Sequence, residues 1–306
     1  MALAACSSNG STGTSAPTPA PTPTPVPTPT PTPTASYTKF DALTGDQTYL
    51  TGCSLGIYSP STGTIPDLQD TSLYSQGLRI AYTAATDSYV ISGDGLSVRY
   101  GPADYASQSG GVKMWVKNDG AELFTIETPI ADTPLDYARA TFLDTLKDGV
   151  YHSYGCITGV PTLTFDVPTT STITYTVQGG INATGRFSED ILPTIYSLPK
   201  GIGTFQVDFA MRKIQTTLHL IGLTAGQGAP RKQIDLGSVT GTGTIDPVSG
   251  AFSGTWTSTD HDVAGSFKGI FFGPQAQEFG YAFAIRGKDS GGAALFETRG
   301  VLNGKR

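Results

Sequence analysis

The sequence predicts an all-β protein, in which an eight-stranded antiparallel up-and-down barrel follows a β-rich domain and a disordered Pro-Thr linker. From residue 169 onward, short runs of alternating apolar and polar residues are separated by Gly, Pro and Asp turns, a pattern typical of antiparallel strands. The 306 residues include 38 glycines, and 20 aspartates against five glutamates, which favours turns over helices. Nine of the 21 prolines stand at every second position from Pro17 to Pro33, where regular hydrogen-bonded structure is excluded.

Residues 1–36 are predicted to be an anchor and a spacer. The segment from Leu3 to Cys6, Leu-Ala-Ala-Cys, resembles a bacterial lipobox, in which the cysteine is acylated, so Cys6 is the predicted lipidation site. The alternating prolines predict an extended polyproline-like tether with a rise of about 3.1 Å per residue. We therefore expect a membrane partner through the N-terminal lipid, and display at the outer membrane or cell surface of a Gram-negative bacterium.

Residues 37–168 are predicted to be a β-rich domain of less regular pattern. Alternating runs between Asp, Gly and Pro turns predict strands over 77–82, 88–92, 96–100 and 112–116. The segment 135–146 fits both a helical spacing of apolar residues and a strand alternation, so its structure stays open at this point.

Residues 169–306 are predicted to be the barrel domain. Its eight expected strands cover 171–177, 203–210, 214–221, 233–245, 251–258, 263–271, 276–286 and 293–302. The interior of a barrel of this size is either filled by side chains or holds one small ligand.

One stretch of the barrel carries a family signature. It consists of a Gly-x-Phe-x-Gly strand, a Phe-Gly-Pro corner followed by Glu, and a Gly-x-x-Phe strand, formed by Gly265, Phe267, Gly269, Phe272, Gly273, Pro274, Glu278, Gly280 and Phe283. This pattern resembles the barrel of the transferrin-binding protein B family of surface lipoproteins. The resemblance implies a single lobe, a handle-like domain over 37–168, and a binding role in iron or haem acquisition. The corner residues are expected to be structural, with Glu278 accepting backbone N–H bonds.

The two cysteines of the body, Cys53 and Cys156, are a candidate disulfide. In an exported protein they would close a loop of about a hundred residues, whereas in a cytosolic protein the same two residues would be buried thiols. The compartment decides between these alternatives.

Several function classes are disfavoured. A net charge of −6 without a basic face argues against a nucleic-acid partner, and no apolar run reaches the roughly 18–20 residues of a membrane span. The G-x-S-x-G pattern around Ser54 lacks the helix that a hydrolase elbow needs, so no catalytic residue is predicted. The three histidines, His152, His219 and His261, are not at paired metal-ligand spacing, so neither a metal nor a cofactor is predicted; haem is the one cofactor left open.

The predicted function is non-enzymatic binding of an unknown protein or small solute. Turn tyrosines are candidates for the binding surface, namely Tyr58, Tyr74, Tyr105, Tyr151 and Tyr154. The alternatives are a lipocalin-like carrier of a small apolar ligand and an envelope hydrolase. Tight packing of Phe205, Phe209, Trp256 and Phe267 inside the barrel would count against the carrier.

Overall fold

A computed structural model describes residues 10, 13, 35–58, 69–128, 134–189, 192–199, 201–224 and 231–306. In these residues every paired strand is antiparallel, and the only helices are short 3-10 turns. The predicted all-β class is therefore confirmed. No helix in the described ranges is long and apolar enough to cross a bilayer. Cys6 and the prolines of the predicted tether lie outside the described residues.

Two sheets precede the barrel. The first has the order β1 (Gln47–Leu50), β3 (Arg79–Thr83), β4 (Ser88–Gly93), β5 (Leu96–Tyr100). The second has the order β2 (Gly52–Tyr58), β10 (Val150–Gly159), β9 (Ala138–Lys147), β8 (Glu122–Glu127), β7 (Val112–Lys117), β6 (Tyr105–Ser109). The ambiguous segment 135–146 thus enters a strand, β9, which pairs with β8 on one side and β10 on the other.

A shared apolar core joins these two sheets. Ile80 and Ile91 of the first sheet and Trp115 and Phe124 of the second are almost fully buried within it. Each sheet therefore buries one face, and this burial of apolar side chains is the main contribution to the stability of its short strands. That 37–168 and 169–306 are separate domains stays a prediction; Ala35–Arg306 form one compact unit.

The barrel closes as a ring of eight strands. In ring order they are β11 (Thr172–Val177), β14 (Ile202–Asp208), β15 (Lys213–Thr224), β16 (Gln233–Ile245), β17 (Phe252–Thr257), β18 (Asp262–Phe272), β19 (Glu278–Lys288) and β20 (Ala294–Lys305). The pairing of β11 with β20 closes the ring. Each of these strands corresponds to one predicted strand, so the eight-stranded barrel is confirmed.

One hairpin was not predicted. It consists of β12 (Asn182–Glu189) and β13 (Leu192–Ser197), and it extends the ring at one end. β12 pairs with β20, and β13 pairs with β15. The first two strands of the barrel are therefore each built from two pieces, β11 with β12 and β13 with β14.

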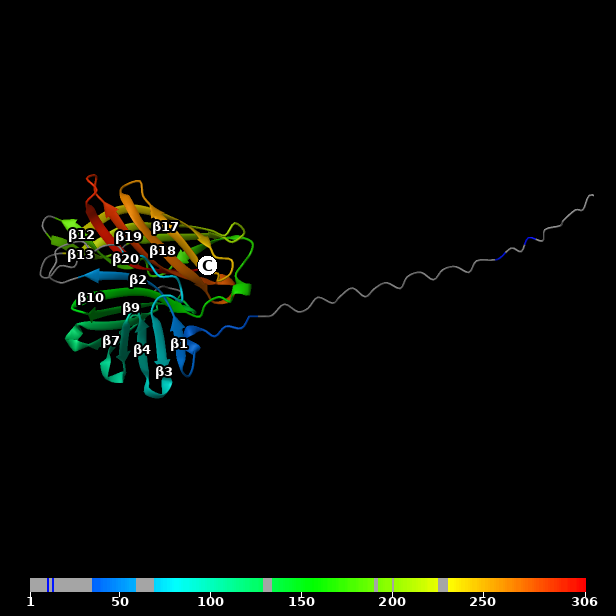
Figure 1. Ribbon diagram of the computed structural model, residues 1–306, viewed down its shortest axis with the longest axis horizontal. Coiled ribbons are helices and arrows are strands. Elements are labelled where there is room, and N and C mark those ends of the chain that lie inside the picture. The colour runs from blue at the N-terminus through cyan, green and yellow to red at the C-terminus, as the bar shows by residue number, and fades with distance from the viewer. Residues whose placement is uncertain are drawn as a thin grey trace, which may run out of the picture. The chain divides into compact units, whose positions relative to one another are not determined.

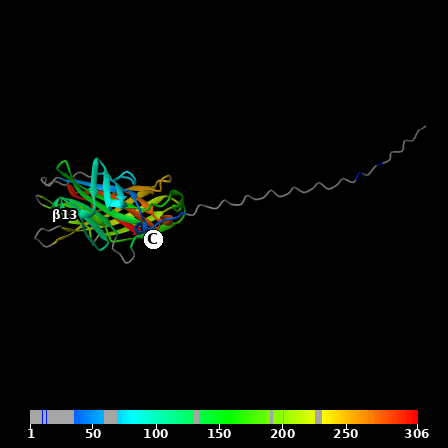
Figure 2. The ribbon, with the colours of Figure 1, turned by 90° about the horizontal axis from the view of Figure 1, so that it is seen from below.

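The second sheet packs against the outer wall of the barrel. Ala138, Ala140 and Ile157 of the sheet meet Ala282 and Val301 of the barrel in a buried cluster. The small side chains allow the two layers to approach closely. In Figure 1, β2, β10 and β9 lie between the barrel strands and the first sheet, and seen from below, the N-terminal strands lie in front of the barrel (Figure 2).

A candidate binding site between two interrupted barrel strands

The barrel interior is filled by aromatic side chains. Phe205, Phe209, Trp256 and Phe267 are at most 3% exposed. The rings of Phe205 and Phe279 stack with their centroids 3.9 Å apart. This packing counts against the lipocalin-like carrier, because the ligand of such a carrier would occupy the same volume.

The signature residues form a strand, a corner and a strand. Gly265, Phe267, Gly269 and Phe272 lie on β18, the corner Gly273–Pro274 leads into the 3-10 turn η6 (Pro274–Ala276), and Glu278, Gly280 and Phe283 lie on β19. Gly273 has a φ of 70°, and a Cβ there would come within 2.3 Å of the Tyr137 ring. Glycine is required at the corner because both its conformation and its surroundings exclude a side chain.

Glu278 links the barrel to the second sheet. It is fully buried, and its carboxylate accepts three backbone N–H bonds, from Asp136 at 2.6 Å, Tyr137 at 3.0 Å and Ala138 at 2.8 Å. Burial raises the pKa of this carboxyl, while the three N–H donors act in the opposite direction. The expected acceptor role is thus present, but the donors come from the start of β9 and not from the corner itself.

Two breaks in the barrel strands lie side by side. Val177 at the end of β11 pairs with Gly304 of β20, and Asn182 at the start of β12 pairs with Val301 of β20. The four residues 178–181 therefore lie opposite only two residues of β20, 302 and 303. The chain between β13 and β14 makes a second break, and Leu198 there donates its N–H to the carbonyl of Ala183 at 3.0 Å. Gly179 and Gly180 allow the first break, with φ values of 70° and 74°.

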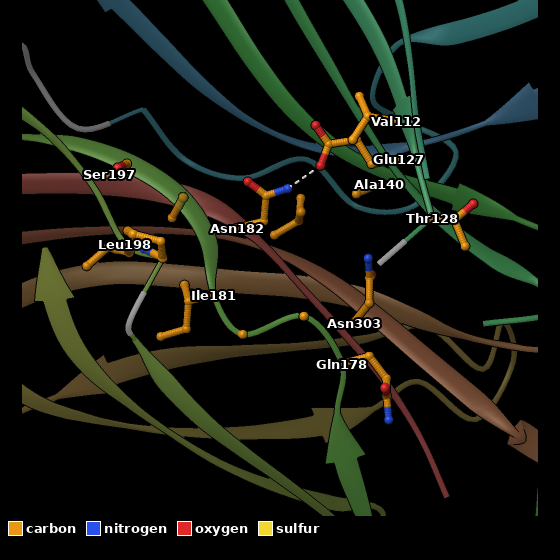
Figure 3. Close-up of a pocket in the computed structure, with 15 residues that line it drawn as sticks. Val112, Glu127, Thr128, Ala140, Gln178, Ile181, Asn182, Ser197, Leu198 and Asn303 are labelled. Atoms are coloured by element: carbon orange, nitrogen blue, oxygen red, sulfur yellow. Dashed lines mark hydrogen bonds between the residues drawn. The ribbon is translucent and has the colours of Figure 1, made fainter. Parts of the chain in front are cut away.

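A cavity of about 280 Å³ opens where these breaks meet the end of β8 (Figure 3). Its lining combines apolar, amide and acidic side chains with loop backbone: Val112, Glu127, Thr128, Ala140, Gln178, Gly179, Gly180, Ile181, Asn182, Ala183, Ser197, Leu198, Pro199, Val301 and Asn303. The site therefore draws on segments that are far apart in the sequence, and it lies on the outside of the barrel.

Among the described residues that line this cavity, Glu127 is the only charged one. Its carboxylate accepts hydrogen bonds from Asn182 Nδ2 at 2.5 Å and Thr125 Oγ1 at 3.3 Å. Burial is the largest influence on the pKa of Glu127 and raises it, and these two neutral donors oppose the shift. The arrangement favours a ligand that can hydrogen-bond to a carboxyl group.

Comparison with known proteins finds one family that is similar to the barrel. Residues 167–301 match the family described as the C-lobe and N-lobe beta barrels of Tf-binding protein B. The barrel is thus similar to the barrel domains of transferrin-binding protein B. No curated protein sequence matches the chain.

Solved structures of transferrin-binding protein B (TbpB) are similar to this chain at low identity. A mutant of the vaccine antigen TbpB from Haemophilus parasuis Hp5 is 15% identical with a TM-score of 0.40, covering 82% of this chain and 58% of that one. Intact Ap-TbpB, with its N and C lobes, is 15% identical with a TM-score of 0.42, covering 82% of this chain and 59% of that one. The chain thus spans less than three fifths of the length of either TbpB.

The hydrolase-like motif is part of the second sheet. Ser54 lies within β2, is fully buried, and donates from Oγ to the carbonyls of Gly155 and Gly300 at 3.2 and 3.3 Å. Gly56 leaves room for Arg299, since a Cβ there would lie 1.8 Å from the guanidinium carbon. Both motif residues thus have structural surroundings, and the strand–turn–helix of a nucleophile elbow is absent from β2.

The three histidines lie in separate surroundings. His152 contacts the Tyr154 hydroxyl at 3.3 Å, His219 pairs with Asp235 at 3.0 Å on the barrel exterior, and His261 packs edge-on against Phe296. Burial lowers the pKa of His152. Among the described residues, no group of three or more His, Cys, Asp or Glu side chains is placed to hold a metal ion.

The remaining predicted site residues are divided between interior and surface. Cys53 and Cys156 lie opposite each other on β2 and β10 and are joined in a disulfide. Tyr154 is buried, whereas Tyr105 is 44% exposed. The candidate tyrosines therefore do not form one common surface, and the cavity residues Glu127 and Asn303 were not singled out from the sequence.

Proposed function

We propose that this protein is a lipid-anchored binding protein at the surface of a Gram-negative bacterium, held through Cys6 and without catalytic activity. The observation that carries the proposal is the match of residues 167–301 to the barrels of Tf-binding protein B. That relative binds Tf according to its name; the ligand here is a protein or a small solute, with iron or haem acquisition as the proposed setting. The spread of the hydrolase-like and histidine residues over separate surroundings supports a binding role.

A protein partner is supported by one end of the barrel. Four apolar side chains are exposed there on neighbouring loops: Leu163, Phe165, Met211 and Val248, from 42% to 81% exposed. The residues beside them, Thr164, Arg212 and Pro247, line one shallow pocket, so the loops converge. Exposed apolar groups gathered in this way are typical of interaction surfaces.

The anchor is tested by labelling the natural gene product with palmitate in wild-type cells and in a Cys6→Ala strain. We expect label and outer-membrane fractionation in the wild type only, and proteinase K added to intact cells should degrade the wild-type protein. An unlabelled wild-type protein in the cytosol would refute the anchored location.

Binding is tested with the immobilised full chain and with haemin in solution. A protein captured from host fluid by the wild type, and lost when Phe165, Met211 and Val248 are all changed to Ser, would identify a partner of the loop surface. A matched control changes Thr255, Thr257 and Thr242 of the barrel wall to Ser and should retain capture. A Soret shift on haemin titration would support the haem setting, and its absence would remove it.

A further inference from the structure

We propose that the cavity between the interrupted strands binds a small organic amine that also carries a hydroxyl group, with the ligand ammonium paired to Glu127. The inference names the solute class for the binding role proposed above and rests on that role. It draws on three features of the cavity: its charge, a buried amide in its lining, and its apolar walls.

The charge of the cavity selects a cation. Of the lining residues that the structure describes, Glu127 is the only charged one, and none is Lys, Arg or His. The two hydrogen bonds to its carboxylate come from neutral groups, Asn182 and Thr125. A carboxylate partly removed from water is stabilised by an opposite charge much more than by neutral donors. An ammonium group would supply that charge, whereas an anionic ligand would be repelled.

Asn303 indicates a second polar group on the ligand. This residue of β20 is 4% exposed, and its Oδ1 is buried without a hydrogen-bond partner. Figure 3 shows its amide nitrogen directed toward Thr128, another lining residue, on the side opposite Ile181 and Leu198, whereas Oδ1 lies against Gly280 of β19. An occupant that pairs with the amide nitrogen gains a hydrogen bond inside the cavity, so a ligand with a polar group at this position is favoured. A hydroxyl fits because it both donates and accepts, and so pairs with the amide in either orientation.

The walls determine the rest of the ligand. Ile181, Leu198 and Val301 are at most 2% exposed and line the cavity with hydrocarbon. The volume of about 280 Å³ equals that of about nine water molecules at roughly 30 Å³ each. A short branched hydrocarbon chain that carries one ammonium and one hydroxyl group combines these three requirements.

The test is isothermal titration calorimetry of the full chain with leucinol, which has an ammonium, a hydroxyl and an isobutyl group. Two matched probes lack one feature each: 4-methylpentan-1-ol has no amine, and 3-methylbutylamine has no hydroxyl. A third probe, 4-methylpentanoate, reverses the charge. We expect leucinol to bind most tightly, each matched probe to bind at least fivefold more weakly, and 4-methylpentanoate not to bind.

Two variants connect binding to the carboxylate. Glu127→Gln keeps the shape of the side chain and should weaken leucinol binding at least tenfold. Glu122→Gln removes a charge from the same strand outside the cavity lining, and should leave the affinity unchanged. If Glu127→Gln does not fold, Glu127→Asp provides the test, because shortening the side chain withdraws the carboxylate from the ligand and should weaken leucinol binding more than 4-methylpentan-1-ol binding.

The inference is overturned if leucinol does not bind, if leucinol and 4-methylpentanoate bind equally, or if Glu127→Gln binds leucinol as the wild type does. These outcomes are distinct from failure of the proposed function. A chain that ignores all four probes but still captures a partner through the loop surface would overturn the amine site alone.

Discussion

The contact between Glu278 and the start of β9 gives the most direct prediction about stability. Glu278→Gln keeps the size of the side chain but replaces one carboxylate oxygen by an NH₂ group. The wild-type carboxylate accepts from three backbone N–H groups, two of them at one oxygen. In the variant the amide oxygen can serve that pair, and the NH₂ group then faces the N–H of Asp136, which loses its acceptor.

The expected loss follows from these contacts. One N–H left without an acceptor costs about 1–3 kcal/mol, and two bonds that lose their charge-assisted character weaken by about 1 kcal/mol each. Removing a buried charge returns part of this loss, because burial disfavours the ionised carboxyl and raises its pKa. We expect a net decrease of about 2–3 kcal/mol in the free energy of unfolding.

Guanidinium chloride denaturation followed by circular dichroism measures this decrease, and Glu122→Gln serves as the control for loss of a glutamate charge. Hydrogen exchange adds a local readout, since the amides of Asp136, Tyr137 and Ala138 should exchange faster in the variant. If Glu278→Gln unfolds within about 0.5 kcal/mol of the wild type and these amides keep their protection, the carboxylate does not stabilise this junction and the reasoning is refuted.

Three further predictions concern stability. Replacing Cys53 and Cys156 together by Ala should lower the free energy of unfolding by about 3–5 kcal/mol, because the unfolded chain gains the freedom of a long loop; equal denaturation midpoints for variant and wild type would contradict this. Gly56→Ala should lower the free energy of unfolding by about 3–5 kcal/mol, because the new methyl group displaces Arg299 from its ion pair with the buried Glu297. A melting temperature equal to that of the wild type would contradict this. The third prediction concerns pH and rests on two carboxyls whose pKa values are raised by burial: Glu127 and Glu297. Above the unfolded Glu pKa of about 4.3, the folded state binds more protons than the unfolded state, so the contribution of these carboxyls to stability is largest below that pH and falls as the pH rises through their folded pKa values. Denaturation midpoints measured from pH 4.5 to 7 check this. A contribution that grows over this interval would contradict it.

Much of the barrel could be predicted because its strands bury one face each. On β18, Phe267 and Phe271 belong to the barrel core while Lys268 and Ile270 lie on the opposite face of the strand, which produces the period-two pattern in the sequence. β19 follows the same rule, with small residues such as Ala282 on the face that meets the second sheet. Glycines and prolines mark the ends of these strands, so their order could be read directly.

The missed hairpin lacks these signals. β12 contains polar residues with little apolar alternation, and β13 contains Pro193, which argues against a strand in a sequence-based prediction. These strands are specified by their pairing with β20 and β15, which is a tertiary effect.

The candidate site could be predicted even less. Glu127 and Asn303 belong to strands far apart in sequence, and neither is part of a local motif. The local signal in the sequence is the pair of strand-breaking segments, Gly179-Gly180 and Leu198-Pro199, and neither segment indicates that the other lies beside it.

The closure of the ring by β20 has a consequence for biosynthesis. This strand comes after all other strands of the ring and pairs with β11, β12 and β19. The barrel therefore cannot close until β20 has been synthesised, and the earlier strands remain without their final partner while the chain is being made. Such late, long-range pairing slows folding. An exported chain would benefit, because a polypeptide that has not closed its barrel can still pass through a secretion channel. A nonsense mutation before β20 would leave the whole ring open, because both ring neighbours of β20 would lose their partner.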